Sequence, residues 1–223
     1  MSPQSNYWDR VAHEKRFSHP LRKNWLARYL DSQSRILDYG CGYGRSLTEL
    51  SEAGYENVVG MDFSESMLTR CRVELPFSKV IRNDGRGLPL KAGCFDAVLL
   101  FAVLTCIPDG DEQRHLIFEI EQALRPGGII YLSDLLVNDD ARNRERYQRF
   151  AEGYKCYGVF ELPEGVAVRH HQVEWIDELT CSFQRLEYEP FKVTTMNGNV
   201  SAAFQYLGRK LKEAETCQQQ HFE

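Results

Sequence analysis

The sequence predicts an α/β protein: a Rossmann-like, mostly parallel seven-stranded sheet with helices on both faces and a C-terminal antiparallel hairpin. Short β-branched or apolar runs alternate with segments of helical spacing through the middle of the chain, and this alternation is typical of a parallel sheet between helical layers. Three glycines follow the first apolar run at alternate positions, which excludes a continued strand there. An Asn-Gly pair separates two strand-like runs near the C-terminus, and such a pair favours a hairpin.

The central elements follow in order along the chain. The apolar runs predict strands at residues 35–39, 58–62, 79–83, 95–101 and 129–135. Apolar stripes between these strands predict three helices. The first ends near Gly54, the second begins at Ser64 as its N-cap, and the third begins at Asp109 or Asp111 and closes at residues 126–128.

Both ends of the chain depart from this alternation. Residues 6–31 have helical spacing, and residues 136–172 form a long polar stretch rich in Tyr, Arg and Gly. One more amphipathic helix, with Trp175 and Phe183 in its stripe, precedes the hairpin around Asn197-Gly198-Asn199. We therefore expect a single domain over residues 1–223, divided into an N-terminal helical cap (1–31), a core (35–135), an insert that caps a substrate site (136–172), and the C-terminal helix and hairpin (173–210).

Composition narrows the class of protein. The net charge of −5 argues against a nucleic-acid partner, since such proteins usually carry a basic face. No run approaches the roughly 18 apolar residues of a membrane span, and the N-terminus lacks the apolar region of a secretory signal. The seven cysteines form no C-x-x-C pair. We expect a cytoplasmic, reduced protein without a membrane partner, either a monomer or a homodimer. A solvated helix face explains the basic residues Arg142, Arg144, Arg146 and Arg149.

The glycine-rich turn lies in the stretch ILDYGCGYGR, residues 36–45. A dinucleotide fingerprint, G-x-G-x-x-G, would place its last glycine at Arg45 or Leu47, so the pattern argues against a nicotinamide-dependent oxidoreductase. The turn instead reads Asp38-x-Gly40-x-Gly42-x-Gly44. Removal of Cβ atoms at the carboxyl edge of a parallel sheet allows a ligand to lie directly on the backbone.

This pattern, in this order of elements, resembles the class I S-adenosylmethionine-dependent methyltransferases over residues 35–135. Further motifs follow in register. Asp62 and Phe63 end the second strand, and Asn83-Asp84-Gly85 ends the third. FDAVLLFAVL looks like the fourth-strand motif of the family, and ALRPGGIIYLSD looks like the turn and the fifth strand.

The resemblance implies S-adenosylmethionine as cofactor and S-adenosylhomocysteine as product. In the family pattern Asp38 would hold the methionine ammonium, Asp62 both ribose hydroxyls, and Asp84 the adenine amine, with Phe63 against the adenine. Two of the acids have simpler explanations: Asp38 as a helix cap and Asp62 as an acceptor for turn amides. The implied cofactor-binding residues are Asp38, Gly40, Cys41, Gly42, Gly44, Asp62, Phe63, Asp84, Gly85 and Phe101.

The region after the fourth strand indicates the class of acceptor. Residues 101–104 read Phe-Ala-Val-Leu, not the Pro-Pro-aromatic motif of methylases that act on nucleic-acid amines. Cys106 is better explained as a small buried hydrophobe than as a nucleophile. An apolar exit suits a small-molecule acceptor. Its candidate site residues are Tyr7, Trp8 and His13 from the N-terminal segment, together with Tyr157 and Arg169 from the insert.

The stretch VRHHQVEW, residues 168–175, supplies candidate catalytic groups. His170 or His171 could act as general base at cellular pH, and Arg169 could hold a carboxylate or phosphate of the acceptor. Alternatively, the adjacent histidines point opposite ways and at least one is structural. They lack further ligands at close spacing, so we expect no metal site. A non-catalytic cofactor-binding protein and a protein or RNA methyltransferase remain as alternative functions.

Overall fold

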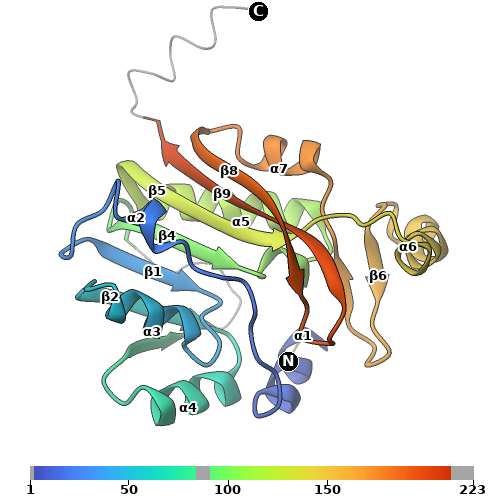
Figure 1. Cartoon of the computed structure of the whole chain (residues 1–223), viewed down its shortest axis with the longest axis horizontal. Helices are drawn as coiled ribbons and strands as arrows, with labels where there is room; N and C mark the ends of the chain where they lie inside the picture. The colour runs from blue at the N-terminus through green and yellow to red at the C-terminus, as the bar shows by residue number, and fades with distance from the viewer. Residues whose placement is uncertain (1–2, 84–90, 212–223) are drawn as a thin grey trace, which may run out of the picture.

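The computed structural model describes residues 3–83 and 91–211 and confirms the predicted fold class. The main sheet has the strand order β3-β2-β1-β4-β5-β9-β8 (Figure 1). β1 to β5 are parallel, whereas β9 runs antiparallel to β5 and β8 antiparallel to β9. The strands are β1 Arg35–Tyr39, β2 Asn57–Asp62, β3 Lys79–Arg82, β4 Phe95–Phe101, β5 Leu124–Leu135, β8 Phe183–Thr194 and β9 Val200–Lys210.

Helices cover both faces of the sheet. They are α1 Pro3–Val11, α2 Lys23–Leu26, α3 Arg45–Glu52, α4 Glu65–Glu74, α5 Gly110–Ala123, α6 Ala141–Tyr154 and α7 Val173–Leu179, with a 3₁₀ turn η1 at Leu104–Cys106. Along β4, Val98 and Leu100 face the apolar cluster under α5 and α7. Ala97 and Leu99 face the cluster under α2 and α3. Strands buried on both faces explain the nearly continuous apolar runs in the sequence.

The predicted N-caps and the hairpin are confirmed, whereas α5 ends at Ala123, before the predicted close at residues 126–128. Ser64 Oγ accepts the N–H of Met67 at the start of α4, and Asp109, rather than Asp111, caps α5. The β8–β9 hairpin turns at residues 195–199. β5 begins earlier than predicted, because Leu124 already pairs with Phe95 before a register shift.

The N-terminal segment differs from the helical expectation for residues 6–31. α1 ends at Val11, and residues 15–22 are extended before the short α2. Tertiary contacts fix this segment across the sheet: His19 Nδ1 lies 2.9 Å from Ser133 Oγ, and the Arg22 N–H donates to the Tyr131 hydroxyl. Contacts with distant strands, rather than local helix propensity, decide its conformation.

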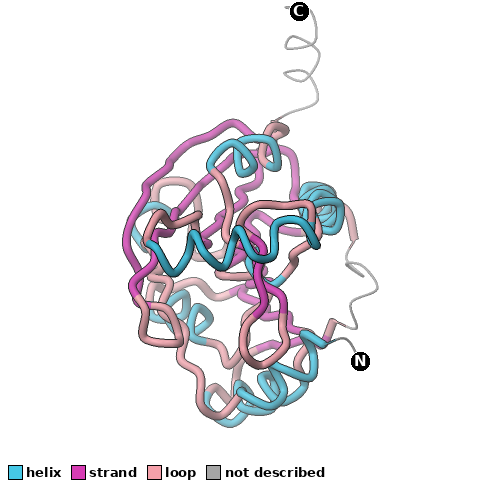
Figure 2. The backbone as a smooth tube through the Cα atoms, turned by 90° about the vertical axis from the view of Figure 1, so that its right-hand side faces the viewer, coloured by secondary structure: helices cyan, strands magenta, loops and turns pink. Residues whose placement is uncertain are grey.

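The insert, residues 136–172, is more regular than its composition indicates. It contains α6 and a separate two-stranded sheet of β6 (Val159–Glu161) and β7 (Ala167–Arg169). Figure 2 shows α6 lengthwise in front of the main sheet, with this small hairpin beside it. α7 ends at Leu179, so Phe183 begins β8 and is not part of the helix.

The strand order places a crevice at the carboxyl ends of β1 and β4. β1 pairs with β2 on one side and with β4 on the other, so the chain leaves these neighbouring strands in opposite directions. Open α/β sheets bind ligands at this switch point. None of the helices in the described part of the chain is long and apolar enough to cross a membrane.

Candidate functional site

The turn between β1 and α3 places three glycines at this edge of the sheet. Gly40, Gly42 and Gly44 have φ angles of +76°, +54° and +90°, which favour glycine. A Cβ on Gly42 would lie 2.1 Å from Cε2 of Phe17, and one on Gly40 would lie 2.5 Å from Cγ2 of Val103. Both conformation and close packing therefore require glycine in this turn.

The N-terminal segment lies over the glycine turn. The Phe17 ring stacks on Tyr43 at a centroid distance of 4.8 Å, and the Phe17 N–H donates to the Tyr43 hydroxyl at 3.0 Å. Arg70 on α4 donates to the carbonyls of Ala12 and Lys15. These contacts hold Phe17 on the backbone of Gly42 and make the N-terminal segment a wall of the site.

Asp38, on β1, offers an unsatisfied carboxylate to the crevice. It is 2% exposed, and its Oδ2 accepts no hydrogen bond from the described residues. Burial raises the pKa of Asp38 to about 7, although the nearby Arg45 guanidinium opposes that shift. A buried carboxylate oxygen without a donor is costly, so this site fits a ligand with a cationic N–H donor. The helix-cap alternative does not apply, since Gly44 is the N-cap of α3 and no side chain caps this helix.

Asp62, at the end of β2, joins the glycine turn to the start of α4. Its Oδ2 accepts the Gly42 N–H and its Oδ1 accepts the Ser64 N–H, both at 2.8 Å. Burial raises the pKa of Asp62 to about 6, partly opposed by these amides. The alternative in which Asp62 satisfies turn amides is thus present in the structure. Each oxygen still has a second lone pair, so the carboxylate can also accept from a diol.

The other residues predicted to bind the cofactor differ in burial and in the contacts that their side chains make. Phe63 is half-buried beside Asp62. The Cys41 side chain turns inward, since a Cβ on Gly60 would lie 2.8 Å from its Sγ. Phe101 packs edge-on against Tyr131 with ring centroids 4.9 Å apart. Asp84 and Gly85 lie outside the described residues.

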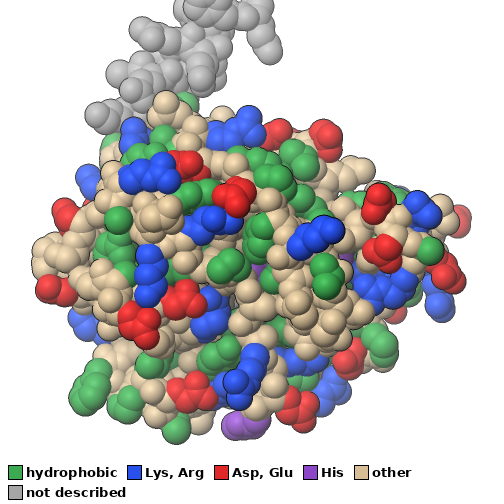
Figure 3. Space-filling model, viewed as in Figure 1, with side chains coloured by type: hydrophobic (Ala, Val, Ile, Leu, Met, Phe, Trp, Pro, Cys, Tyr) green, Lys and Arg blue, Asp and Glu red, His purple; other side chains and the backbone are tan. Residues whose placement is uncertain are grey.

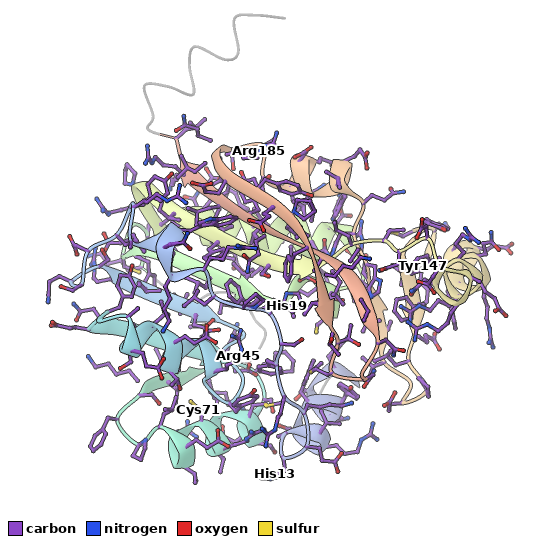
Figure 4. The ribbon with its side chains drawn as sticks, viewed as in Figure 1. His13, His19, Arg45, Cys71, Tyr147 and Arg185 are labelled. Atoms are coloured by element: carbon purple, nitrogen blue, oxygen red, sulfur yellow. The ribbon has the colours of Figure 1, made fainter. Side chains whose placement is uncertain are left out.

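Arg45 is a site residue that the sequence reasoning missed. It begins α3 directly after the glycine turn and pairs with Glu49 at 2.6 Å. Its Nε is buried without a hydrogen-bond partner among the described residues. Figure 4 shows Arg45 near the carboxyl end of β1. Its place immediately after the third glycine, at the first residue of the following helix, was the signal that could have identified it.

A mostly apolar cavity of about 110 Å³ lies between α1, the insert and the tip of the β8–β9 hairpin. Tyr7, Trp8 and Phe160 form apolar walls, and His170 and Cys106 also line it. The structure therefore brings together three of the predicted substrate or catalytic residues, from both caps. An engineered cavity of about 150 Å³ holds benzene, so this space has room for about one small ring.

The other predicted substrate residues do not line this cavity. His13 follows the end of α1 and is exposed, and Figure 4 shows it at the lower edge of the molecule. Tyr157 and Arg169 line a different cleft beside α7.

The two adjacent histidines have different environments. The Nδ1 of His170 lies 2.6 Å from the Tyr147 hydroxyl, and no described residue bonds its Nε2. His171 donates from Nδ1 to the Leu135 carbonyl at 3.1 Å and accepts at Nε2 from the Gln113 amide at 3.0 Å. Burial lowers the pKa of both, to about 3 for His171. His171 is fully bonded within the protein, whereas His170 has a nitrogen available to the cavity.

The basic face of α6 departs from the expectation at one residue. Arg142, Arg144 and Arg149 are exposed, as a solvated face requires, although Arg142 also reaches the cavity lining. Arg146 is half-buried and lines the cavity, with its guanidinium carbon 3.4 Å from the centroid of Phe160 and its Nε buried without a partner among the described residues. On the face shown in Figure 3, Lys and Arg side chains are interspersed with Asp and Glu.

Comparisons with known proteins agree with this geometry. A family model described as a methyltransferase domain matches residues 37–132. The demethylmenaquinone methyltransferase of Staphylococcus carnosus is 27% identical over 214 residues, 86% of this chain and 84% of that protein. A solved S-adenosylmethionine-dependent methyltransferase from Methanosarcina mazei is 25% identical, with a TM-score of 0.79 over 85% of this chain and 98% of that chain.

A relative that acts on RNA is also similar over a shorter length. The 18S rRNA (guanine(1575)-N(7))-methyltransferase of Saccharomyces cerevisiae is 34% identical over 116 residues, which are 48% of this chain and 42% of that protein.

Proposed function

The chain belongs to the class I S-adenosylmethionine-dependent methyltransferases, and we propose that it methylates a small molecule that enters the cavity between α1, the insert and the β8–β9 hairpin. Methyltransferase activity and S-adenosylmethionine as cofactor follow from the family. The class of acceptor and the roles of individual residues are our proposal.

The chain's own residues match the groups of this cofactor. Asp38 would hold the ammonium group through its free Oδ2, and the turn Gly40–Gly44 would receive the amino acid portion on bare backbone. Asp62 would accept from the ribose hydroxyls, and Arg45 would face the carboxylate. When bound, S-adenosylmethionine supplies an electrophilic methyl carbon whose bond to sulfur breaks as the bond to the acceptor forms.

The observation that carries the small-molecule proposal is the size and lining of the cavity. About 110 Å³ with aromatic walls suits a ring or a short apolar body, whereas a nucleic-acid strand needs an open basic groove. Arg146, with its unpartnered Nε, would favour an acceptor that carries negative charge near the ring. A phenol, an enol or an aromatic acid has this combination.

His170 is the proposed general base. Its Nε2 would take the acceptor's proton as the acceptor atom attacks the methyl carbon. Since burial keeps the pKa of His170 low, the imidazole is neutral at cellular pH and able to accept. Tyr7, Trp8 and Phe160 would exclude water and orient the acceptor against the cofactor. His171 has no part in this step, because both of its ring nitrogens are engaged.

Formation of S-adenosylhomocysteine tests the proposal. We expect the product with a panel of small phenols, enols and aromatic acids, and no stimulation by ribosomal RNA. His170→Ala should lower turnover by about 10²-fold or more and leave affinity for S-adenosylhomocysteine unchanged. His115→Ala is the matched control, because this histidine is exposed on α5. RNA-stimulated product would favour the rRNA alternative, and cofactor binding without transfer to any acceptor would favour a non-catalytic protein.

A further inference from the structure

A second cleft, of about 340 Å³, lies between the insert and α7. Its lining includes Arg169, Lys155 and Tyr157 from the insert and Trp175, Glu174 and Glu178 from α7. It shares no lining residue with the acceptor cavity. In Figure 1, α7 and the small strand β6 flank this part of the molecule. The cleft is therefore a separate site.

Arg169 supplies this cleft with a buried cation that lacks a counter-ion. The residue is 7% exposed, and no carboxylate of the described residues forms an ion pair with it. Its one hydrogen bond to a described residue is a long one, from Nη1 to the Pro108 carbonyl at 3.5 Å. Its Nε is buried without a partner within the described chain. An uncompensated buried charge is strongly unfavourable, so the arrangement is incomplete without an anion.

The guanidinium is also held in a fixed orientation. Its central carbon lies 4.4 Å from the centroid of Trp175, and the Trp175 indole N–H is bound by Gln113 Oε1 at 2.7 Å. A Cβ on Gly110 would lie 3.1 Å from the Trp175 ring and 3.4 Å from Arg169 Nη1, so the start of α5 packs against both side chains. With Nη1 directed at Pro108, the edge formed by Nε and Nη2 has no partner among the described residues. Nε is buried on this edge, so a carboxylate in the cleft would meet the guanidinium through Nη2 in a charge-assisted hydrogen bond.

The other charges around the cleft restrict the ligand. Lys155 adds a second cation, while Glu174 and Glu178 add two acidic groups. Glu178 is already paired with Arg114 at 2.7 Å. A polyphosphate would bring several negative charges against these acids, whereas a single carboxylate brings one, which the guanidinium of Arg169 compensates. Tyr157, 38% exposed, and Trp175 offer aromatic surface for an apolar body.

We propose that this cleft binds a small aromatic monocarboxylate, with its carboxylate on the free edge of Arg169 and its ring against Tyr157 and Trp175. The sequence reasoning assigned Arg169 to the methyl acceptor. The structure instead assigns it to a site of its own, and this proposal does not depend on which acceptor is methylated.

Calorimetric titration of the full chain with benzoate tests the site, with benzamide as the neutral isostere. We expect saturable benzoate binding and at least about tenfold weaker binding of benzamide. Arg169→Gln should weaken benzoate binding by about tenfold or more. Arg185→Gln is the matched control: Arg185 is an exposed arginine paired with Asp177 at 3.2 Å, it does not line the cleft, and its loss should change affinity by less than about threefold.

Several results would overturn this inference. They are the absence of saturable benzoate binding, equal binding of benzamide, tighter binding of inorganic phosphate, or unchanged affinity in Arg169→Gln. If that variant does not fold, Arg169→Lys serves instead: it keeps the charge but loses the planar guanidinium that stacks on Trp175, and should still weaken binding several-fold. S-adenosylhomocysteine affinity, measured in the same samples, reports on the cofactor site and separates failure of this site from failure of the proposed function.

Discussion

The imidazole Nδ1 of His170 lies 2.6 Å from the phenol oxygen of Tyr147. Tyr147 is fully buried on α6, accepts the Asn138 N–H at 3.3 Å and can donate to Asn143 Oδ1 at 3.4 Å. Figure 4 shows Tyr147 on the side of α6 that faces the rest of the molecule. If Nδ1–H donates to Tyr147 and Tyr147 donates to Asn143, the chain of bonds fixes the tautomer in which Nε2 is an acceptor.

Tyr147→Phe should therefore lower kcat by about tenfold, because His170 loses the bond that selects the reactive tautomer. The change should leave the KM for S-adenosylmethionine within about twofold, since Tyr147 is remote from the glycine turn. Steady-state kinetics across pH 6–9 checks this. Tyr154→Phe is the control, because Tyr154 bonds only the exposed Glu161. An unchanged kcat in Tyr147→Phe would remove the positioning role.

Asp38 predicts a pH dependence of cofactor affinity. Its pKa in the free protein is about 7, and only the ionised carboxylate can pair with an ammonium group. Affinity for S-adenosylhomocysteine should therefore fall by up to about tenfold per unit as pH drops below 7. Asp38→Asn should bind more weakly at pH 8 and lose most of this dependence. Calorimetry from pH 5.5 to 8.5 measures both effects, and an identical pH profile in the variant would refute the assignment.

The same shift has a consequence for stability. The folded-state pKa of Asp38 lies above its unfolded value of 3.8, so between about pH 4 and 7 the native state binds more protons than the unfolded state. The contribution of Asp38 to the free energy of unfolding of the ligand-free protein should therefore fall as pH rises through this window, whereas the buried His19 and His171, whose pKa values are lowered, act in the opposite sense. Thermal unfolding of the wild type and of Asp38→Asn at pH 5 and pH 8 isolates the Asp38 contribution, and the variant should gain stability relative to the wild type as pH rises.

Gly42→Ala tests the close approach of Phe17. A Cβ there would lie 2.1 Å from the Phe17 ring, at a φ of +54°. We expect a loss of about 1–3 kcal/mol in the free energy of unfolding and at least about tenfold weaker cofactor binding. In a Phe17→Ala background the steric part should vanish, leaving about 1–2 kcal/mol for the left-handed backbone.

Gly153→Ala is the matched control for this experiment, because Gly153 lies in α6 and a Cβ added to it would meet no atom within 4 Å. It should be neutral or stabilising by about 0.5–1 kcal/mol. Equal losses for Gly42→Ala in both backgrounds would show that Phe17 is not responsible.

Features encoded locally could be predicted from the sequence. β1 and β4 match their predicted bounds, because fully buried parallel strands need continuous apolar runs. The glycine turn could be located because it requires positive φ angles. Ser64 could be assigned because an N-cap acts within one turn of its helix.

Features fixed by distant contacts could not be predicted in this way. The charge pattern indicated a helix face at Arg142–Arg149, but the bounds of α6 could not be predicted because its buried stripe is thin and polar, with only Asn143 and Tyr147 buried. The sequence analysis did not predict β7. It therefore could not indicate that the side chains of Arg169 and His170, successive residues of extended backbone, would point to opposite sides. Their separation into two cavities is therefore a product of the insert's tertiary structure.

Cys106 provides the last test, because it lines the acceptor cavity and a nucleophilic cysteine would change the reaction class. Burial, with the nearby Asp134 carboxylate adding to it, raises the pKa of the Cys106 thiol well above its usual range. Its Sγ lies 3.5 Å from the Ala102 carbonyl, as a donor and not as a thiolate. Since only the thiolate is nucleophilic, Cys106→Ala should leave kcat within about threefold of the wild-type value. Loss of an essential nucleophile would lower kcat by several orders of magnitude. A kcat reduced that far in Cys106→Ala, with folding and cofactor binding intact, would favour a covalent mechanism through Cys106 over base-assisted transfer.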